Sequence, residues 1–217
     1  MMHPSTHLLH INDAIGVGVF ATAPIPQGTI VYVKDALEVQ IGPDEYHTMH
    51  PLARVTVDRY SYKEPGGSRI VSWDLAKYVN HSCNANSLST AWGFEIAIRD
   101  IAAGEEITDE YGMFNLDEEL SCCCGHASCR SMISPLDLER YSDRWDAVVR
   151  TALQQASHVD QPLLGLMNGE QRDDLQKYLQ TGRRYRSVRS LRLVAPLAAA
   201  RNREPGRPAK QDVYMPS

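Results

Sequence analysis

Cysteine is the residue type whose spacing points most directly to chemistry in this 217-residue chain. Four of the five cysteines lie within eight residues, at Cys122, Cys123, Cys124 and Cys129, and Cys83 stands apart. An odd number of cysteines, three of them adjacent, is a poor framework for disulfides and favours a metal site in a reducing compartment. The pattern Cys122-x-Cys124-x4-Cys129 supplies three thiolates, one ligand fewer than a closed tetrahedral zinc site needs.

Two residues are candidates for the fourth zinc ligand, Cys83 and His126. We favour Cys83, because His126 lies inside the short loop between Cys124 and Cys129 and would have to turn back on it. Cys123 is then expected to point away from the metal, although Cys122 and Cys123 could exchange these roles. Buried thiols without a metal are the alternative interpretation.

Three further segments could bind a small ligand or take part in a reaction. Residues 16–18, Gly-Val-Gly, allow a close approach of the backbone to a ligand, although two such glycines are usually only a turn. Residues 80–86 concentrate hydrogen-bonding side chains, which suggests a ligand site. Residues 104–112 place Tyr111 after four carboxylates. A tyrosine of pKa ~10 is a poor base at neutral pH, but its hydroxyl can orient an amine or stabilise developing charge.

Short strands are the elements that must position these residues in the first 115 positions or so. The β-branched, aromatic or alternating runs that predict strands are residues 15–20, 29–33, 70–74, 94–98 and 106–108. Residues 74–79 can form one helical turn. Residues 42–69 are rich in Pro, Gly and Tyr without a clean period, and this predicts a loop-rich insert.

Helices are expected only after Ser134. Ser134 as N-cap and Pro135 as first helical residue predict a helix start, and an apolar stripe from Leu138 to Leu153 recurs at helical spacing. Two shorter helices should begin near residues 160 and 168, the second ending at Gly182. Beyond it, four prolines and no period predict a flexible tail.

The charge of the chain is unevenly distributed. Net charge is −5, but residues 182–217 hold nine Lys/Arg and two acids, so they carry +7 and the rest −12. An acidic body suits a cationic partner, and a basic tail suits an anionic polymer. Apolar runs are far shorter than the ~18–20 residues of a membrane span, and residues 1–11 do not resemble a signal peptide. We expect no membrane association and an intracellular, cytoplasmic location, with a nuclear or secreted protein as alternatives.

The order of these segments resembles the SET-domain protein-lysine methyltransferases that have a post-SET zinc loop. The four motifs are Gly-x-Gly, Asn-His-Ser-Cys-x-x-Asn, Gly-Glu-Glu-Ile-Thr-x-x-Tyr-Gly and Cys-x-Cys-x4-Cys, and they cover roughly residues 8–132. The resemblance implies a mainly β fold, the SET β-clip, with a pseudoknot in which residues 107–111 thread beside 80–83. It also implies a SET domain at 8–119, a post-SET zinc loop at 120–133, a helical extension at 134–182 and a basic tail at 183–217.

The resemblance further implies a role for individual residues. Family members bind S-adenosylmethionine on one face and lysine on the other, joined by a narrow channel. Here the backbone of Gly16, Val17, Gly18, Val19 and Phe20 would hold the methionine part of the cofactor, together with Asn80 and His81. Tyr111 would be the catalytic tyrosine, with its hydroxyl near the transferred methyl. The zinc ligands would be Cys83, Cys122, Cys124 and Cys129.

Three positions depart from the family pattern. Ala85 stands where the family usually has Pro. Asp109 stands where a Phe or Tyr often helps to set the number of methyl groups added, so that number is left open. A further family tyrosine has Tyr32 as its nearest match, with Lys34 in competition.

We expect the chain to methylate lysine in a protein or peptide, a histone or another basic protein. The alternatives are a catalytically silent, SET-like peptide-binding module and a zinc protein that contacts nucleic acid through residues 183–210.

Overall fold

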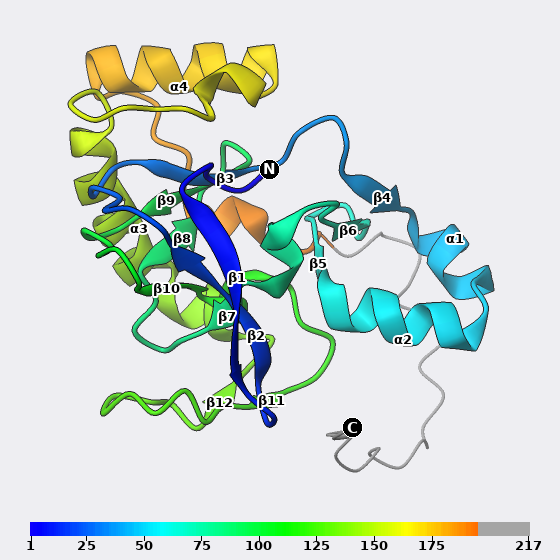
Figure 1. Cartoon of the computed structure of the whole chain (residues 1–217). Helices are drawn as coiled ribbons and strands as arrows, with labels where there is room; N and C mark the ends of the chain where they lie inside the picture. The colour runs from blue at the N-terminus through cyan, green and yellow to red at the C-terminus, as the bar shows by residue number, and fades with distance from the viewer. Residues whose placement is uncertain (195–217) are drawn as a thin grey trace.

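Short strands in four small β-sheets make up most of the regular secondary structure in the first 133 residues of the computed structural model, which describes residues 1–194 (Figure 1). The strands are β1 Thr6–Asn12, β2 Gly16–Ala21, β3 Ile30–Val33, β4 Val39–Ile41, β5 Ser61–Lys63, β6 Arg69–Val71, β7 Asn80–His81, β8 Ser87–Ser89, β9 Phe94–Ala97, β10 Glu106–Asp109, β11 Leu120–Ser121 and β12 Met132–Ile133. The α-helices are α1 Pro43–Thr48, α2 Pro51–Tyr60, α3 Asp137–Gln155 and α4 Gly169–Thr181. The 3-10 turns are η1 Leu75–Tyr78, η2 Tyr111–Met113, η3 Leu164–Leu166 and η4 Val188–Leu191. The mainly β fold expected from the sequence is confirmed.

One sheet brings together three of the four motif segments. Its strand order is β1-β2-β10-β7, so β10 lies between strands that precede it by more than twenty residues. β10 pairs antiparallel with β2, where Ile107 faces Val19. It pairs parallel with β7, where Thr108 faces Asn80 and Asp109 faces His81. The segment before Tyr111 therefore lies beside residues 80–81, as expected.

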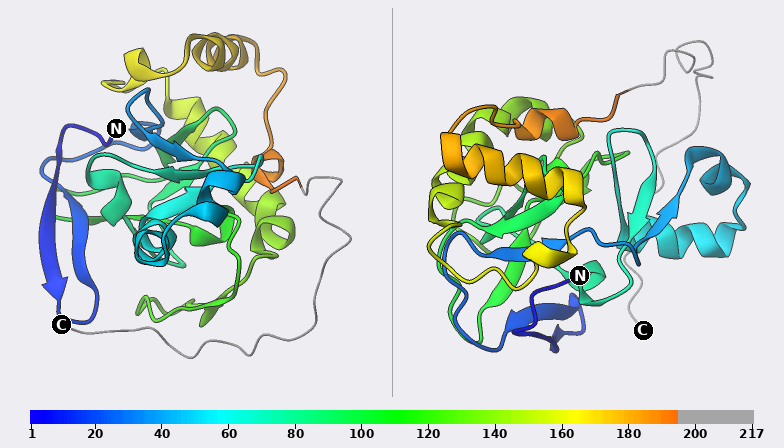
Figure 2. Two further views of the ribbon diagram at one scale, coloured as in Figure 1. Left: turned by 90° about the vertical axis from the view of Figure 1, so that its right-hand side faces the viewer. Right: turned by 90° about the horizontal axis from the view of Figure 1, so that it is seen from above.

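The sheet β3-β9-β8 is the centre of the larger core. Its alternating Ile, Val and Phe side chains meet the apolar stripe of α3, where Leu138, Trp145, Val149 and Leu153 are buried. A second core of buried residues lies around β2, β3 and β10. The helix after residue 134 thus shares its core with the strands that precede it, and Figure 2 shows it packed against them.

The expectation of a loop-rich insert at 42–69 is wrong, because α1 and α2 occupy much of it. Pro43 and Pro51 each stand at the start of a helix, where the missing N–H costs nothing. Asp44 and Glu45 occupy the first turn of α1, and the His50 ring accepts a hydrogen bond from the Leu52 amide at 3.3 Å. These helix-start signals of α1 and α2 are visible in the sequence. The helices are short and nearly without buried residues, so no apolar stripe reveals them.

The α3 helix begins slightly later than the sequence suggests. Its first residue is Asp137, and Leu136 is the N-cap, without a side-chain cap. The Asp137 carboxylate accepts from the Ser134 amide at 3.1 Å, and the Ser134 carbonyl accepts from the Asp137 amide at 2.9 Å. The Ser134 hydroxyl accepts from the Leu136 amide at 3.3 Å. The expected later helices are present as η3 and α4, and α4 ends at Gly182 with a φ of 65°.

A glycine at the contact between α3 and the strands gives a stability prediction. Gly28 has a φ of 92°, and an added Cβ would lie 2.7 Å from Gln155 Cβ and 2.9 Å from the Ala152 carbonyl oxygen. Left-handed strain and overlap together should make Gly28→Ala less stable by at least about 2 kcal/mol. Gly104→Ala is the matched control, since Gly104 has a φ of 80° and open space around it. Thermal unfolding of both variants checks this prediction. Equal losses of stability in the two variants would mean that α3 moves away from the added methyl group without an energetic cost.

No helix within residues 1–194 is both long enough and apolar enough to cross a membrane.

Candidate active site

A cavity of about 570 Å³ opens beside β10, lined by residues of β3, β5, β6, β9, η1 and η2 and by the end of α2. Four aromatic side chains form part of its wall: Tyr32, Tyr62, Tyr111 and Phe114. The rings of Tyr62 and Tyr111 lie 5.5 and 5.4 Å from that of Phe114. Such a wall suits an apolar stem that ends in a cation.

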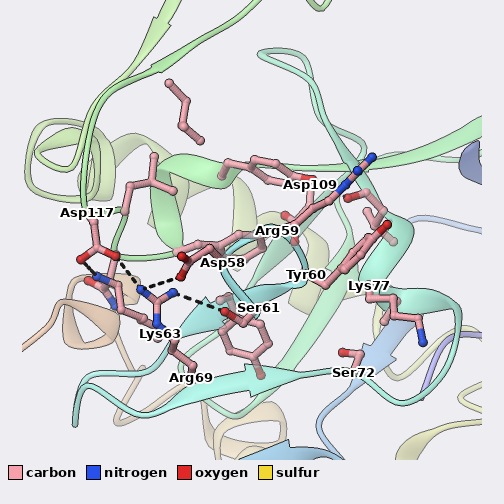
Figure 3. A pocket seen from close by; sticks show the side chains of 18 of the residues that line it. Asp58, Arg59, Tyr60, Ser61, Lys63, Arg69, Ser72, Lys77, Asp109 and Asp117 are labelled. Carbon is pink, nitrogen blue, oxygen red and sulfur yellow. Dashed lines mark hydrogen bonds and ion pairs between the residues drawn. The ribbon is translucent and has the colours of Figure 1, made fainter. Parts of the chain in front are cut away.

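The rim of this cavity carries charges of both signs. Arg69 contacts Asp117 at 2.7 Å and Asp58 at 3.3 Å, and Lys63 also pairs with Asp117 (Figure 3). The guanidinium of Arg69 also stands over the Tyr46 ring at 4.1 Å. These contacts tie α1 and α2 to the loop after η2, so the insert forms one side of the cavity mouth.

Tyr111 is held by its hydroxyl and its ring. The hydroxyl donates a hydrogen bond to the Val79 carbonyl at 2.7 Å, and the ring lies 5.4 Å from that of His81. Burial raises the pKa of Tyr111, and the nearby carboxyl groups of Asp109 and Glu95 raise it further. Tyr111 therefore keeps its proton at neutral pH, which makes it a hydrogen-bond donor and an orienting group rather than a base.

Two carboxyl groups line the cavity beside Tyr111. Asp109 is 1% exposed, and Glu95 on β9 is partly buried on the same cavity wall. Burial raises the pKa of Asp109 to about 6. Burial also raises the pKa of Glu95, and the neighbouring charge of Asp109 adds to that rise. Asp109 is the position where the sequence departs from the aromatic family pattern.

Asn80 and His81 connect the motif segments. The Asn80 amide donates to the Val17 carbonyl at 3.0 Å and to the Glu106 carboxylate at 2.8 Å. Nδ1 of His81 accepts from the Tyr111 amide at 3.2 Å, and Nε2 faces the Cys83 sulfur at 3.4 Å. Burial and, to a smaller extent, the charge of Arg130 lower the pKa of His81 to about 4. His81 is therefore neutral at pH 7 and serves as a link between Tyr111 and the cysteines.

Four cysteine sulfurs form a cluster: those of Cys83, Cys122, Cys124 and Cys129, all within 4.8 Å of one another. The Cys122 sulfur lies 3.7 Å from that of Cys83 and 3.6 Å from that of Cys129. A tetrahedral zinc with Zn–S bonds of about 2.3 Å would place its sulfurs about 3.8 Å apart, so the cluster has the size of a zinc site. Exposed Cys123 and His126 lie outside it.

Arg130 joins the cysteine cluster to the residues around Tyr111. Its amide donates to the Cys83 sulfur at 3.3 Å, and its guanidinium donates to the Glu110 carboxylate at 2.5 Å. The guanidinium also lies 3.5 Å from Asp137 at the start of α3. Glu110 in turn accepts from the Gly112 amide at 2.9 Å. The cluster, the turn that holds Tyr111 and the first turn of α3 are thus connected through one side chain.

The structure places most of the sequence-predicted residues together. Asn80, His81, Tyr111 and the four clustered cysteines form one contiguous region, and residues 16–20 lie on β2 next to β10. Tyr32 lines the cavity, whereas Lys34 lies outside it and pairs with Glu64 at 2.5 Å. Sequence reasoning missed four residues of the site: Tyr62, Glu95, Phe114 and Arg130. Phe114 lies only three residues after Tyr111 and carries no distinguishing signal. Tyr62, Glu95 and Arg130 are brought to the site only by the fold.

Comparison with known proteins names the fold of this region. The protein-family model for the SET domain matches residues 16–112. The chain contains a SET domain. This domain includes Asn80, His81, Cys83, Asp109 and Tyr111, and the other three clustered cysteines follow it.

The relatives of this SET domain include proteins named histone-lysine methyltransferases. The chain is 38% identical over 137 residues to "Histone H3-lysine(4) N-trimethyltransferase ATX1" of Arabidopsis thaliana, which is 57% of the chain and 13% of that protein. It is 28% identical over 137 residues to "Histone-lysine N-methyltransferase ATX2" of the same plant, covering 57% of the chain and 12% of that protein. It is 30% identical over 135 residues to "Variant-silencing SET domain-containing protein" of Plasmodium falciparum (isolate 3D7), covering 54% of the chain and 5% of that protein. The similarity therefore spans only a small part of each relative.

Proposed function

We propose that this chain transfers a methyl group from S-adenosylmethionine to the side-chain amine of a lysine in a protein, a histone or another basic protein. The observation that carries the proposal is Tyr111 at the end of the SET domain, lining an aromatic cavity that ends in carboxyl groups. The relatives' names support lysine as the target. A lysine side chain has the matching chemistry, an apolar stem and a cationic head.

We propose that residues on β2 and β7 bind the methyl donor. The proposed cofactor-binding residues are Gly16, Val17, Gly18, Val19, Phe20, Asn80, His81 and Tyr111. A Cβ on Gly18 would lie 2.4 Å from Glu106 Oε1 and 3.0 Å from the Asn80 amide nitrogen, so glycine is what lets this backbone lie against Asn80. When bound, S-adenosylmethionine supplies a methyl carbon on a positively charged sulfur.

The residues of the cavity prepare the amine for this transfer. Methyl transfer is an in-line displacement that needs a neutral amine in a fixed position. The aromatic walls exclude water, and desolvation lowers the pKa of a bound lysine. The protonated hydroxyl of Tyr111 lies beside the path of the amine and orients it.

We also propose that the four clustered cysteines hold a zinc ion with a structural role. Four protein ligands close a tetrahedral site and leave no position for substrate. The proposed ligands come from residue 83 and from residues 122–129, so the metal would connect the SET domain to the loop after it. This loop would be the post-SET segment expected from the sequence.

Methyl transfer can be tested with purified protein, S-adenosylmethionine and a panel of core histones and basic peptides, read by mass spectrometry. We expect lysine residues to gain 14 Da per methyl group, the mass of CH₂ by atomic weights. Cofactor titration by calorimetry is the companion measurement. Binding of the cofactor without transfer to any substrate would favour the silent module, and absence of both would refute the proposal.

Two expectations from the sequence stay predictions. The cytoplasmic location is one of them. The nucleic-acid contact by residues 183–210 is the other, and residues 195–210 lie outside the described part of the chain.

A further inference from the structure

Asp109 carries an oxygen atom that the folded chain leaves unused. Its Oδ1 accepts from the Glu110 amide at 2.7 Å, but no N–H or hydroxyl group in residues 1–194 donates to its Oδ2. The residue is 1% exposed and lines the cavity (Figure 3). Tyr111 lines the same cavity. A buried carboxyl oxygen without a hydrogen-bond donor lowers the stability of the fold. We therefore expect a ligand that enters the cavity to donate to this oxygen.

Glu95 on β9 lines the same cavity, and the charge of Asp109 adds to the effect of burial in raising the pKa of its carboxyl group. Two carboxylates this close cannot both ionise freely, so near neutral pH the pair keeps one proton and one negative charge. Glu95 is the better place for that proton, because burial and the charge of Asp109 raise the pKa of Glu95 well above its usual range, whereas the pKa of Asp109 is raised to about 6. Asp109 then offers Oδ2 as an anionic acceptor.

The groups around this pair do not neutralise it. They come from all the neighbouring elements and are His81, Glu110, Tyr111, Tyr32, Tyr62, Glu38 and the amino terminus. The amino terminus is a cation near Glu95 and is itself paired with Asp35 and Glu38. Four further cations line the cavity: Lys63 and Arg69 are paired with Asp117, Arg59 stands over the Tyr60 ring, and Lys77 stands over the Tyr78 ring. Lys34 shares a hollow with Glu95 but is paired with Glu64.

We propose that Glu95 and Asp109 form a proton-accepting pair that binds the substrate ammonium group and removes one proton from its nitrogen before methyl transfer. This inference rests on the proposed function. The N–H bond breaks toward Oδ2 of Asp109, and its electrons remain on nitrogen as the lone pair that forms the new N–C bond. The C–S bond breaks with its electrons on sulfur. The pair then releases its extra proton to water, which restores its single negative charge.

A carboxylate acceptor suits this role because a general base works best when its pKa lies near the operating pH. The transfer also requires the amine to be neutral, and an aqueous lysine of pKa ~10.4 is almost wholly protonated at pH 7. Desolvation lowers the pKa of the lysine ammonium group but provides no group in the cavity that accepts its proton. The Glu95–Asp109 pair provides such an acceptor beside the lysine nitrogen.

The test uses the purified full chain, S-adenosylmethionine and a histone-tail peptide, with single-turnover rates measured from pH 5.5 to 10. The wild-type rate should rise through about pH 6 as Asp109 ionises. Asp109→Asn should lose about 10²–10⁴-fold at pH 7, the usual contribution of general-base catalysis. The deficit should shrink toward pH 10, because solvent hydroxide then removes the proton. A second peptide carries aminoethylcysteine in place of lysine, and the amine of aminoethylcysteine has a lower pKa than that of lysine. Changing to this peptide should raise the rate of Asp109→Asn by a larger factor than the rate of the wild type.

Two further variants sharpen the test. Glu95→Gln should shift the rise in rate to lower pH, because the amide donates to Asp109 and removes a neighbouring carboxyl group. Glu170→Gln, an exposed carboxylate on α4, makes the same chemical change far from the cavity and should keep the wild-type profile.

Thermal unfolding separates a catalytic pair from a structural one. The raised pKa of Asp109 means that its ionised form destabilises the fold above about pH 6, so Asp109→Asn should be at least as stable as wild type at pH 8. A loss of stability together with a pH-independent loss of rate would make Asp109 structural and overturn the inference. An unchanged rate at pH 7 would overturn it as well. A wild-type protein that methylates nothing would instead refute the proposed function, and the inference with it.

Discussion

Tyr111→Phe is expected to abolish most methyl transfer while leaving the fold and cofactor binding intact. The substitution removes one hydroxyl, which in the structure donates to the Val79 carbonyl and lies in the cavity wall. Removing one oriented donor from an active site typically lowers kcat by about 10²–10³-fold. The ring, which packs against His81 and Phe114, is retained, so its contacts persist. Transfer rates measured with saturating cofactor and peptide check this.

Tyr185→Phe is the matched control for the loss of a buried hydroxyl. Tyr185 donates to Asp146 at 2.8 Å on the far side of α3 and does not line the cavity. It should lose some stability and keep its rate. If Tyr111→Phe turned over at the wild-type rate, or lost cofactor affinity in proportion to its rate, the catalytic role of Tyr111 would be wrong.

Cys83→Ser is expected to release zinc and to lose most activity, even though residue 83 does not line the cavity. Elemental analysis of the wild type should give about one zinc per chain, and the variant should give little. The substitution also removes the sulfur that the His81 ring and the Arg130 amide both contact. Glu110 and the turn that holds Tyr111 then lose their connection to the loop after β11. Circular dichroism should show that the β-sheets persist.

Cys123→Ser provides the control, because Cys123 is exposed and lies outside the cluster although it stands between two proposed ligands. It should keep zinc and activity. The opposite result would be a Cys83→Ser variant that keeps its zinc and a His126→Ala variant that releases it. All four ligands would then lie in the loop, and the metal would not connect that loop to the active site.

The sequence could predict the motif segments because each depends on local chemistry or on a pattern along the chain. Gly-x-Gly, the polar run at residue 80 and the cysteine spacing are visible without any structure, and their order identifies the fold. The apolar stripe of α3 is equally visible, since its period persists for five turns. The division of the chain into a SET domain, zinc loop, helical extension and tail stays a prediction.

Other features depend on contacts between distant residues and leave no local pattern. Glu95 looks like the solvent-facing residue of a half-buried strand, and only the pairing of β9 with its neighbours brings it to Asp109. Arg130 looks like one more charged loop residue, but its partners come from residues 83, 110 and 137. The helices α1 and α2 were missed because they bury little and so lack the periodicity that indicates a helix.

The strand order β1-β2-β10-β7 has a consequence for how the chain acquires its structure. During synthesis the β1–β2 hairpin can form as soon as residue 21 has left the ribosome. The other edge of β2 stays unpaired until β10 has been made, since Phe20 of β2 pairs with Glu106 of β10. The larger core waits longer, for α3. Contacts between segments this far apart slow folding and leave an unpaired strand edge and apolar side chains exposed in the nascent chain. We therefore expect folding to be completed late, in one step after synthesis of α3, and to benefit from chaperones that cover β2 in the meantime.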